Sequence, residues 1–547
     1  MFPEKENIPS GGTFSTKSSF SAHSSEKVLL AVIATGLVFL ITLISFLYDF
    51  ILSLKEYIPL KGIFNSDNVG LANYQNFFSS VYFVRLLSNT IVQSLLFGIF
   101  IFLISLILET IITYLSPKSI LSSILVTLTL IPVFIPDVVY VSWFINLFSP
   151  ATPFMTPYIA KWFIPLIRAL KYAGIPALVT FVIHEKTHEE KTNKNFSLAL
   201  KVSGCFSLFS IMFINVNDVT ITTLAVNPLI YETIDSFNLF AYRTGLLSAD
   251  YSQAAAVSII SRLLCLITVA ILYFPFKVLA GDIFHRILHS ENEPASNNYL
   301  KPLSSTVIAL ILGIIVFALP FCGKTTNIFD LRALSMLFQN HNVIGAFTLS
   351  IIASLISAAI NVALSAILSY PIVCGKTGLK RISIVLLVLI AVICSVPVSI
   401  GTYMIIRSLG FFNTVFALIL GLLSPISCVW AFVAIARYKK VPEGSRYSKA
   451  ISKPTVALLL VQFVYCFNNY YPSLIYITDR RLHSPSLLYR EIAITGGQAA
   501  GQMSQYGSIA FWYGLILSII PLAILAVLRI CYRKDSLLSI LGMSQRR

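Results

Sequence analysis

Two groups of polar residues interrupt apolar stretches of this chain and are the first candidates for binding chemistry. They are Asn215, Asn217 and Asp218 in one stretch, and Asn468, Asn469 and Tyr470 in the other, with Tyr471 following. An amide supplies both a hydrogen-bond donor and an acceptor, so paired asparagines suit a ligand rich in hydroxyl groups. A tyrosine ring can in addition stack on a sugar ring. The alternative is that these side chains join neighbouring helices by hydrogen bonds.

Charged residues within apolar stretches form a second set of candidates. Asp137 directly follows Pro136 and lies five residues after Pro132. Because prolines break a helix and free main-chain carbonyls, a carboxylate there can line a cavity. A helix-end position at the external interface is the other interpretation. Arg168 and Lys171 suit an acidic sugar, but we favour the simpler expectation that their side chains extend to the outer membrane interface.

Several familiar chemistries are not indicated. The GKTG at residues 375–378 is not a phosphate-binding loop, because such a loop requires glycine where Tyr370 stands. His184 and His188 have the spacing of two metal ligands, but two ligands are weak evidence, and we interpret their segment as a solvated charged loop. The cysteines lie singly in apolar segments. We therefore expect no enzymatic activity, no metal site and no cofactor.

The elements that position these residues must lie in a membrane. The chain has 547 residues, of which 56% are hydrophobic and only 11% charged, whereas soluble proteins have about 25% charged residues. The mean hydropathy is +0.83. A net charge of +16 would favour nucleic acid in a soluble protein, but here the basic residues lie mostly in short connections between apolar stretches. We expect membrane lipid, and no nucleic acid, around this chain.

Apolar stretches of about 20 residues predict spanning helices, and about twelve meet this criterion. They lie near residues 28–53, 87–114, 120–148, 162–183, 197–224, 253–280, 303–321, 343–371, 381–408, 413–436, 454–477 and 507–532. The sequence therefore predicts an all-α transmembrane bundle in two six-helix halves, 28–285 and 303–535. A disordered cytoplasmic leader (1–27), a polar linker (286–302) and a cytoplasmic tail (536–547) complete the predicted organisation.

The distribution of basic residues predicts the orientation. Alternate connections hold clusters of lysine and arginine, at residues 376–381, 437–453 and 529–547. These belong on the cytoplasmic side, so both termini are expected there. Because six is an even number, the halves would be parallel repeats about an axis along the membrane normal. That axis would bring the two asparagine groups together.

Residues 54–90 contain three ordered motifs, K-x-Y-x-P-x-K-G-I, V-G-L-x-x-aromatic and F-x-R-L-x-x-N-T. Their positions are Lys55, Tyr57, Pro59, Lys61, Gly62, Ile63, Val69, Gly70, Leu71, Tyr74, Arg85, Asn89 and Thr90. The series resembles the first external loop and second span of permeases from ABC importers for complex oligosaccharides, the aldouronate type. Residues 227–264 resemble the last external loop and sixth span of the same family. The matching positions there are Asn227, Pro228, Tyr231, Asp235, Tyr242, Arg243, Gly245, Tyr251 and Ala254.

The second half resembles the partner permease of the same systems, in residues 404–420 and more strongly in 463–492. The matching positions of the stronger segment are Asn468, Asn469, Tyr476, Thr478, Asp479, Arg480, Leu482, Pro485, Leu488, Arg490, Glu491 and Ile492. The resemblance implies two fused MetI-like permease folds in a bacterial cytoplasmic membrane. It also implies an extracellular solute-binding lipoprotein and separate ABC ATPase subunits as partners.

The family's coupling to its ATPases depends on a cytoplasmic loop between the fourth and fifth spans, a short helix with an E-A-A…G pattern. In this chain residues 184–200 lack that pattern and have no apolar stripe. Residues 441–454 keep only the two ends of the loop, Pro442 and Glu443 at the start and Lys453 and Pro454 at the finish. The resemblance therefore supports the fold and the external face, and leaves ATP coupling open.

The expected function is a transmembrane permease component of a carbohydrate ABC uptake system, which forms the translocation pathway. Two alternatives remain. One is a pseudo-permease without ATP coupling that acts as a membrane scaffold, receptor or assembly partner. The other is an ATP-independent carrier, which needs a coupling-ion site, and Asp137 and Asp218 are the evident intramembrane acids from which to build it.

Overall fold

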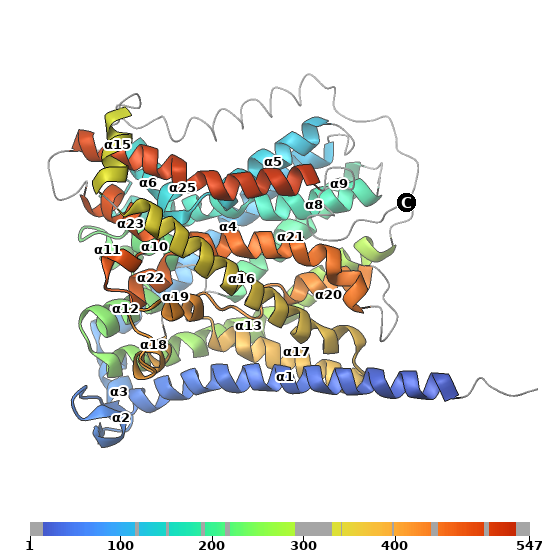
Figure 1. Ribbon diagram of the computed structural model, residues 1–547, viewed down its shortest axis with the longest axis horizontal. Helices are drawn as coiled ribbons and strands as arrows, with labels where there is room; N and C mark the ends of the chain where they lie inside the picture. Colours follow the sequence, from blue (N-terminus) through green and yellow to red (C-terminus); the bar gives the residue numbers. More distant parts are fainter. Residues whose placement is uncertain are drawn as a thin grey trace, which may run out of the picture.

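A computed structural model describes most of the chain. The described residues are 15–114, 120–148, 153–187, 192–213, 219–289, 331–340, 342–396, 399–438, 447–496 and 503–531. Long helices run side by side, roughly along one direction, and short helices gather at one end of the bundle (Figure 1).

The first half consists of long helices joined by short elements. The longer helices are α1 (Ser15–Ser53), α4 (Val81–Tyr114), α5 (Ile120–Phe134), α6 (Asp137–Leu147), α7 (Pro157–Tyr172), α8 (Gly174–Thr187), α9 (Thr192–Met212) and α13 (Tyr251–His289). The short elements are β1 (Lys55–Glu56), α2 (Gly62–Asn65), β2 (Asp67–Asn68), α3 (Ala72–Ser79), α10 (Val219–Ala225), α11 (Tyr231–Ile234), α12 (Phe237–Tyr242) and the π-helical turn η1 (Arg243–Leu247). The strands β1 and β2 pair antiparallel, with Lys55 opposite Asn68.

The second half has the same character. Its longer helices are α15 (Leu331–Asn340), α16 (Val343–Cys374), α17 (Thr377–Ile393), α20 (Val429–Tyr438), α21 (Tyr447–Asn468) and α25 (Met503–Cys531). Its shorter elements are α18 (Ile400–Ser408), α19 (Val415–Gly421), α22 (Tyr471–Tyr476), the 3₁₀ turn η3 (Arg480–Leu482), α23 (Pro485–Arg490) and the π-helical turn η4 (Glu491–Gly496).

The helices have the length and surface of membrane spans. Within the described residues, six segments are long and apolar enough to cross a bilayer. They are Glu26–Ser53, Val81–Tyr114, Pro157–His184, Tyr251–Ile283, Val343–Cys374 and Ser508–Ile530. Large apolar side chains such as Ile41 and Ile271, both 67% exposed, cover their outer faces, and lipid is the solvent that accepts such a surface. The prediction of an all-α membrane protein is confirmed.

Several predicted spans are pairs of shorter helices. The predicted span 120–148 consists of α5 and α6, which meet at an angle of 93°, and 381–408, 413–436 and 454–477 are likewise divided between two helices each. A hydropathy window counts apolar residues and does not detect where the helical hydrogen bonds stop. The predicted linker from residue 290 and the span 303–321 lie outside the described residues. Residues 15–27, predicted to be a disordered leader, belong to α1.

The two halves interlock. Helix α1 contacts α13 of its own half, and it also contacts α16, α17 and α18 of the second half. Helix α25, near the end of the chain, contacts α5 and α6 of the first half. In Figure 1 these two helices form opposite edges of the bundle. Each half therefore contributes a long helix to the packing of the other.

One local motif occurs in both halves, at the end of the bundle where the short helices gather (Figure 1). The Ser236 side chain accepts a hydrogen bond from the Leu239 amide and caps α12, and Ser484 accepts from the Leu487 amide and caps α23 in the same way. Each capped helix has six residues and passes directly into a π-helical turn, η1 or η4. A long helix, α13 or α25, follows each turn.

The same motif carries an acid–base pair in each half, with the order of acid and base along the chain reversed. Asp235, just before the first cap, pairs with Arg243 at the start of η1. His483, just before the second cap, lies 3.0 Å from the carboxylate of Glu491 at the start of η4. The pair in both copies joins the residue before the cap to the first residue of the π turn. The same local arrangement therefore occurs twice in the described residues, at 235–247 and at 483–496.

Candidate functional site

The bend between α5 and α6 is the first feature of the candidate site. Helix α5 ends at Phe134, and the amides of Val139 and Tyr140 bond to the Pro136 carbonyl at 3.1 and 3.0 Å as α6 begins. The carbonyls of Phe134 and Ile135 therefore need partners outside the helix, because helix ends leave such groups unsatisfied. The two prolines beside Asp137 had predicted a break here, and that prediction is confirmed.

Side chains from two other helices satisfy these carbonyls. The Lys171 ammonium, on α7, donates to the Ile135 carbonyl at 2.5 Å and lies 2.9 Å from the Asp137 carboxylate. The Asn468 amide, at the end of α21, donates to the Phe134 carbonyl at 2.9 Å. Within the described part of the chain, the Asn468 side-chain oxygen has no hydrogen-bond partner. We call Asp137, Lys171 and Asn468 the bend cluster; it is assembled from both halves.

The expectation that Arg168 and Lys171 extend to the membrane interface is wrong. Both side chains are 2% exposed. Lys171 is held by Asp137, and the Arg168 guanidinium lies 4.5 Å from the centre of the Phe97 ring on α4. Buried cations of this kind persist only with a partner, which Asp137 and the aromatic ring supply.

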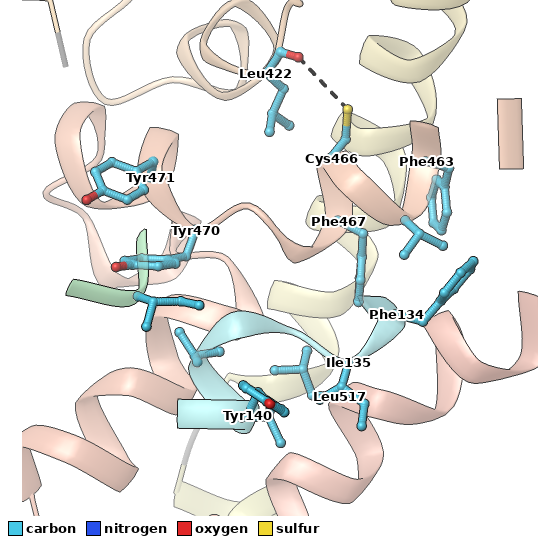
Figure 2. Packing of buried hydrophobic residues seen from close by; sticks show 14 of the residues in the cluster. Phe134, Ile135, Tyr140, Leu422, Phe463, Cys466, Phe467, Tyr470, Tyr471 and Leu517 are labelled. Carbon is cyan, nitrogen blue, oxygen red and sulfur yellow. Dashed lines mark hydrogen bonds between the residues drawn. The ribbon is translucent and has the colours of Figure 1, made fainter. Parts of the chain in front are cut away.

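Tyr470 and Tyr471, which we call the tyrosine pair, lie in the contact region between the two halves, which we call the seam. The hydroxyls of Tyr470 and Tyr471 are 2.8 and 3.0 Å from the Thr223 hydroxyl on α10. The two rings are 5.1 Å apart and buried, and Figure 2 shows their hydroxyls pointing in the same direction. In this structure the rings thus join the two halves, which is the bridging role that the sequence left as the alternative to sugar stacking.

Asn469 has a local role. Its side-chain oxygen accepts from the Tyr471 amide at 3.1 Å, at the start of α22. It also lines a cavity of about 10 Å³ together with Ser350, Ser473 and Ser484. Most of its other lining residues are apolar, among them Leu349 and Leu418.

Several predicted site residues are not placed. Asn215, Asn217, Asp218, Pro442 and Glu443 lie outside the described residues. Lys453 and Pro454, the predicted finish of a coupling loop, lie inside α21, which begins at Tyr447. Residues 184–187 and 192–200, where the first coupling loop was predicted, belong to α8 and α9.

The motifs that carry the permease resemblance meet in space at the end of the bundle that holds the short helices. Arg85 pairs with Glu232 at 3.2 Å, and the Asn89 amide donates to the Glu232 carbonyl at 2.9 Å. The Tyr57 amide donates to the Ser252 hydroxyl at 2.9 Å. Residues 54–90 and 227–264 are thus packed on one another, and these polar residues hold the packing together.

Sequence reasoning missed two buried charges and a buried acid. Asp49 on α1 and Arg262 on α13 form an ion pair of 2.8 Å, with exposed fractions of 0% and 3%. Glu109 on α4 is also fully buried. All three residues lie within predicted spans, and an ionisable residue within a span is itself a sign of function or of a buried partner.

Known proteins give no guide to this site. No family model, curated protein or solved structure matches the chain. Within the described residues, no three His, Cys, Asp or Glu side chains gather in a way that could hold a metal ion. The bend cluster, the tyrosine pair and the buried charges are the features that bear on function.

Proposed function

We propose that this protein is the transmembrane permease component of a carbohydrate uptake system, with the substrate pathway along the seam between its halves. The bend cluster carries the proposal. A broken helix with main-chain carbonyls freed inside a bilayer is how transporters place polar binding groups at membrane depth. Here a carboxylate, an ammonium and an amide with an open acceptor surround such a break.

The repeated capped helix and π turn support a two-half architecture, in which about twelve spans form two MetI-like units. The seam would open and close by alternating access. In the closed form, Tyr470 and Tyr471 bond to Thr223 across the seam, so passage of a solute requires these contacts to part. An extracellular solute-binding lipoprotein would deliver the carbohydrate to the external loops.

A second candidate, the pseudo-permease without ATP coupling, is favoured by one observation. The described parts of the two predicted coupling loops are continuations of longer helices. Residues 184–187 and 192–200 belong to α8 and α9, and Lys453 and Pro454 lie inside α21. These described residues form no separate lever helix. A scaffold or receptor would keep the external face without such a lever.

Two measurements decide between these functions. The first is purification of the tagged full-length protein from its native membrane, with mass spectrometry of the proteins that accompany it. A stoichiometric ABC ATPase would support the ABC permease, whereas its repeated absence beside other membrane or surface partners would favour the pseudo-permease.

The second measurement is oligosaccharide uptake by cells that carry wild-type protein or a variant of the bend cluster. N468A removes the open acceptor and one hydrogen bond, so we expect uptake to fall about tenfold, the equivalent of roughly 1.4 kcal/mol. N68A, at an exposed residue of β2, is the matched control and should transport normally. Normal uptake by N468A would contradict a pathway at the bend.

A further inference from the structure

Glu109 is exceptional among the buried acids. Three acids in the described part of the chain are fully buried, namely Asp49, Glu109 and Asp235. Asp49 pairs with Arg262 and Asp235 with Arg243. Within the described residues no cation stands beside Glu109, and the groups next to its carboxylate are the hydroxyls of Thr180 and Ser203. An isolated carboxylate in an apolar interior is so costly that the group takes up a proton or another cation instead.

Two hydroxyl groups face this carboxyl group from neighbouring helices. Thr180 on α8 and Ser203 on α9 are the side chains adjacent to Glu109, both are fully buried, and neither hydroxyl has a hydrogen-bond partner other than Glu109 within the described residues. Helices α4, α8 and α9 all pack on one another. By contrast, Ser207 and Ser210 on α9 donate to main-chain carbonyls at 2.8 Å. The hydroxyls of Thr180 and Ser203 are thus available for hydrogen bonds with the Glu109 carboxyl group.

We propose that Glu109, Thr180 and Ser203 form a proton-binding site inside the first half. A protonated carboxyl group donates to one hydroxyl and accepts from the other, which completes the hydrogen bonding of all three side chains. A hard metal cation is a poorer fit because it takes about six or more oxygen ligands. Helices α4, α8 and α9 run unbroken past these residues, so their carbonyls are engaged in helical bonds and do not add to the oxygen set.

The location gives this proton a role in transport. Glu109 lies near the end of α4, and Thr180 lies on α8. Helices α7 and α8 form one continuous candidate span, Pro157–His184, and the same span carries Lys171 of the bend cluster. Uptake and release of a proton by Glu109 change its hydrogen bond with Thr180 and therefore act on the span that carries Lys171. This role, the coupling of proton binding at Glu109 to transport, rests on the proposed transport function, whereas the proton site itself does not.

Infrared spectroscopy of the purified full-length protein in lipid vesicles tests the site. At neutral pH the wild type should show the carbonyl-stretch band of a buried protonated carboxylic acid. The band should be absent from E109Q and shifted in T180V and in S203A. D67N is the control: the Asp67 side chain is 68% exposed and pairs with the exposed Lys61, so the band should persist.

Three results would overturn the proton site. They are a wild type without the band at neutral pH, a band that survives in E109Q, and a band that appears only when sodium is removed, which would make the site a cation site. The wild-type spectra and the T180V shift keep the test decisive even if E109Q does not fold.

Uptake of radiolabelled xylotriose into vesicles without ATP tests the coupling role. An inward proton gradient should stimulate uptake by wild type and by D67N, and not by E109Q. Gradient-independent uptake by the wild type would refute the coupling role. Absence of uptake under every condition, with or without an ATPase, would count against the proposed function, while the infrared band would still decide the proton site.

Discussion

Asp49 and Arg262 form a buried ion pair that also caps a helix in the other half of the molecule. The Arg262 guanidinium lies 2.8 Å from the Asp49 carboxylate. The same carboxylate accepts from the Ser399 hydroxyl at 2.7 Å and from the Gly401 amide at 2.6 Å, at the start of α18. This one carboxylate thus joins α1, α13 and α18. It accepts from the Gly401 amide, which lies at the start of α18, where an amide has no partner within the helix and a negative charge is favourable.

Removing either member of this pair should destabilise the protein strongly. D49A or R262A leaves an unpaired buried charge, which costs about 3–5 kcal/mol. K61A is the control, because Lys61 and Asp67 form an ion pair with side chains 47% and 68% exposed, and such pairs contribute about 0–1 kcal/mol. In detergent, the unfolding temperature should fall strongly for D49A and R262A and hardly at all for K61A. Equal decreases in the three variants would contradict the stabilising role of the Asp49–Arg262 pair.

The Asp137–Lys171 pair should behave as one unit. K171M leaves the Asp137 carboxylate, whose side chain is 17% exposed, without its cation, and D137N leaves the buried Lys171 without its anion. Each single variant should therefore lower the unfolding temperature markedly. The double variant D137N/K171M should lose less free energy of unfolding than the two single variants together, and the difference, the coupling energy, should be about 0.5–3 kcal/mol. Melting curves of the four proteins give this coupling directly. Additive losses would mean that the two side chains do not depend on one another.

Gly174 should be intolerant of a side chain. A Cβ at this position would lie 2.1 Å from the Thr129 carbonyl oxygen on α5, and because that atom is main chain, a helix must shift. We expect G174A to cost about 1–3 kcal/mol through this overpacking. Gly281, within α13, has open space around it, so G281A should be neutral or stabilise by up to about 1 kcal/mol. Comparable unfolding temperatures for the two variants would contradict the close approach of α5 and α8.

The His483–Glu491 pair predicts a dependence of stability on pH. The hydrogen bond with His483, aided by nearby arginines, holds the pKa of Glu491 below its usual range. Because the folded-state pKa is lowered, the stabilisation from Glu491 is present above the ordinary value of about 4.3 and is lost as the pH falls through the lowered pKa. The gap between the unfolding temperatures of wild type and E491Q should therefore be largest above about pH 5 and should close as the pH falls below that value. A gap that stays constant down to pH 3 would disprove the shift.

The sequence was sufficient for the features that depend on neighbours along the chain. Apolar stretches identified the membrane character, and the prolines beside Asp137 located the bend between α5 and α6. Asp137 and Asn468 were each recognised as candidates, on separate grounds. The sequence did not show that both belong to one cluster, because the Asn468 amide and the Phe134 carbonyl that it contacts are 334 residues apart.

Hydropathy is a sum over adjacent residues, so the sequence alone determined that this chain is an α-helical membrane protein with polar residues inside its spans. Only the tertiary structure decided which of those polar residues have partners. Lys171 was expected at the membrane interface and is instead buried against Asp137, whereas Glu109 was overlooked and has the hydroxyls of Thr180 and Ser203 beside it, with no cation within the described residues. The physical reason is that the cost of a buried charge depends on what other helices bring within hydrogen-bond distance, and the path of the chain through space sets that distance.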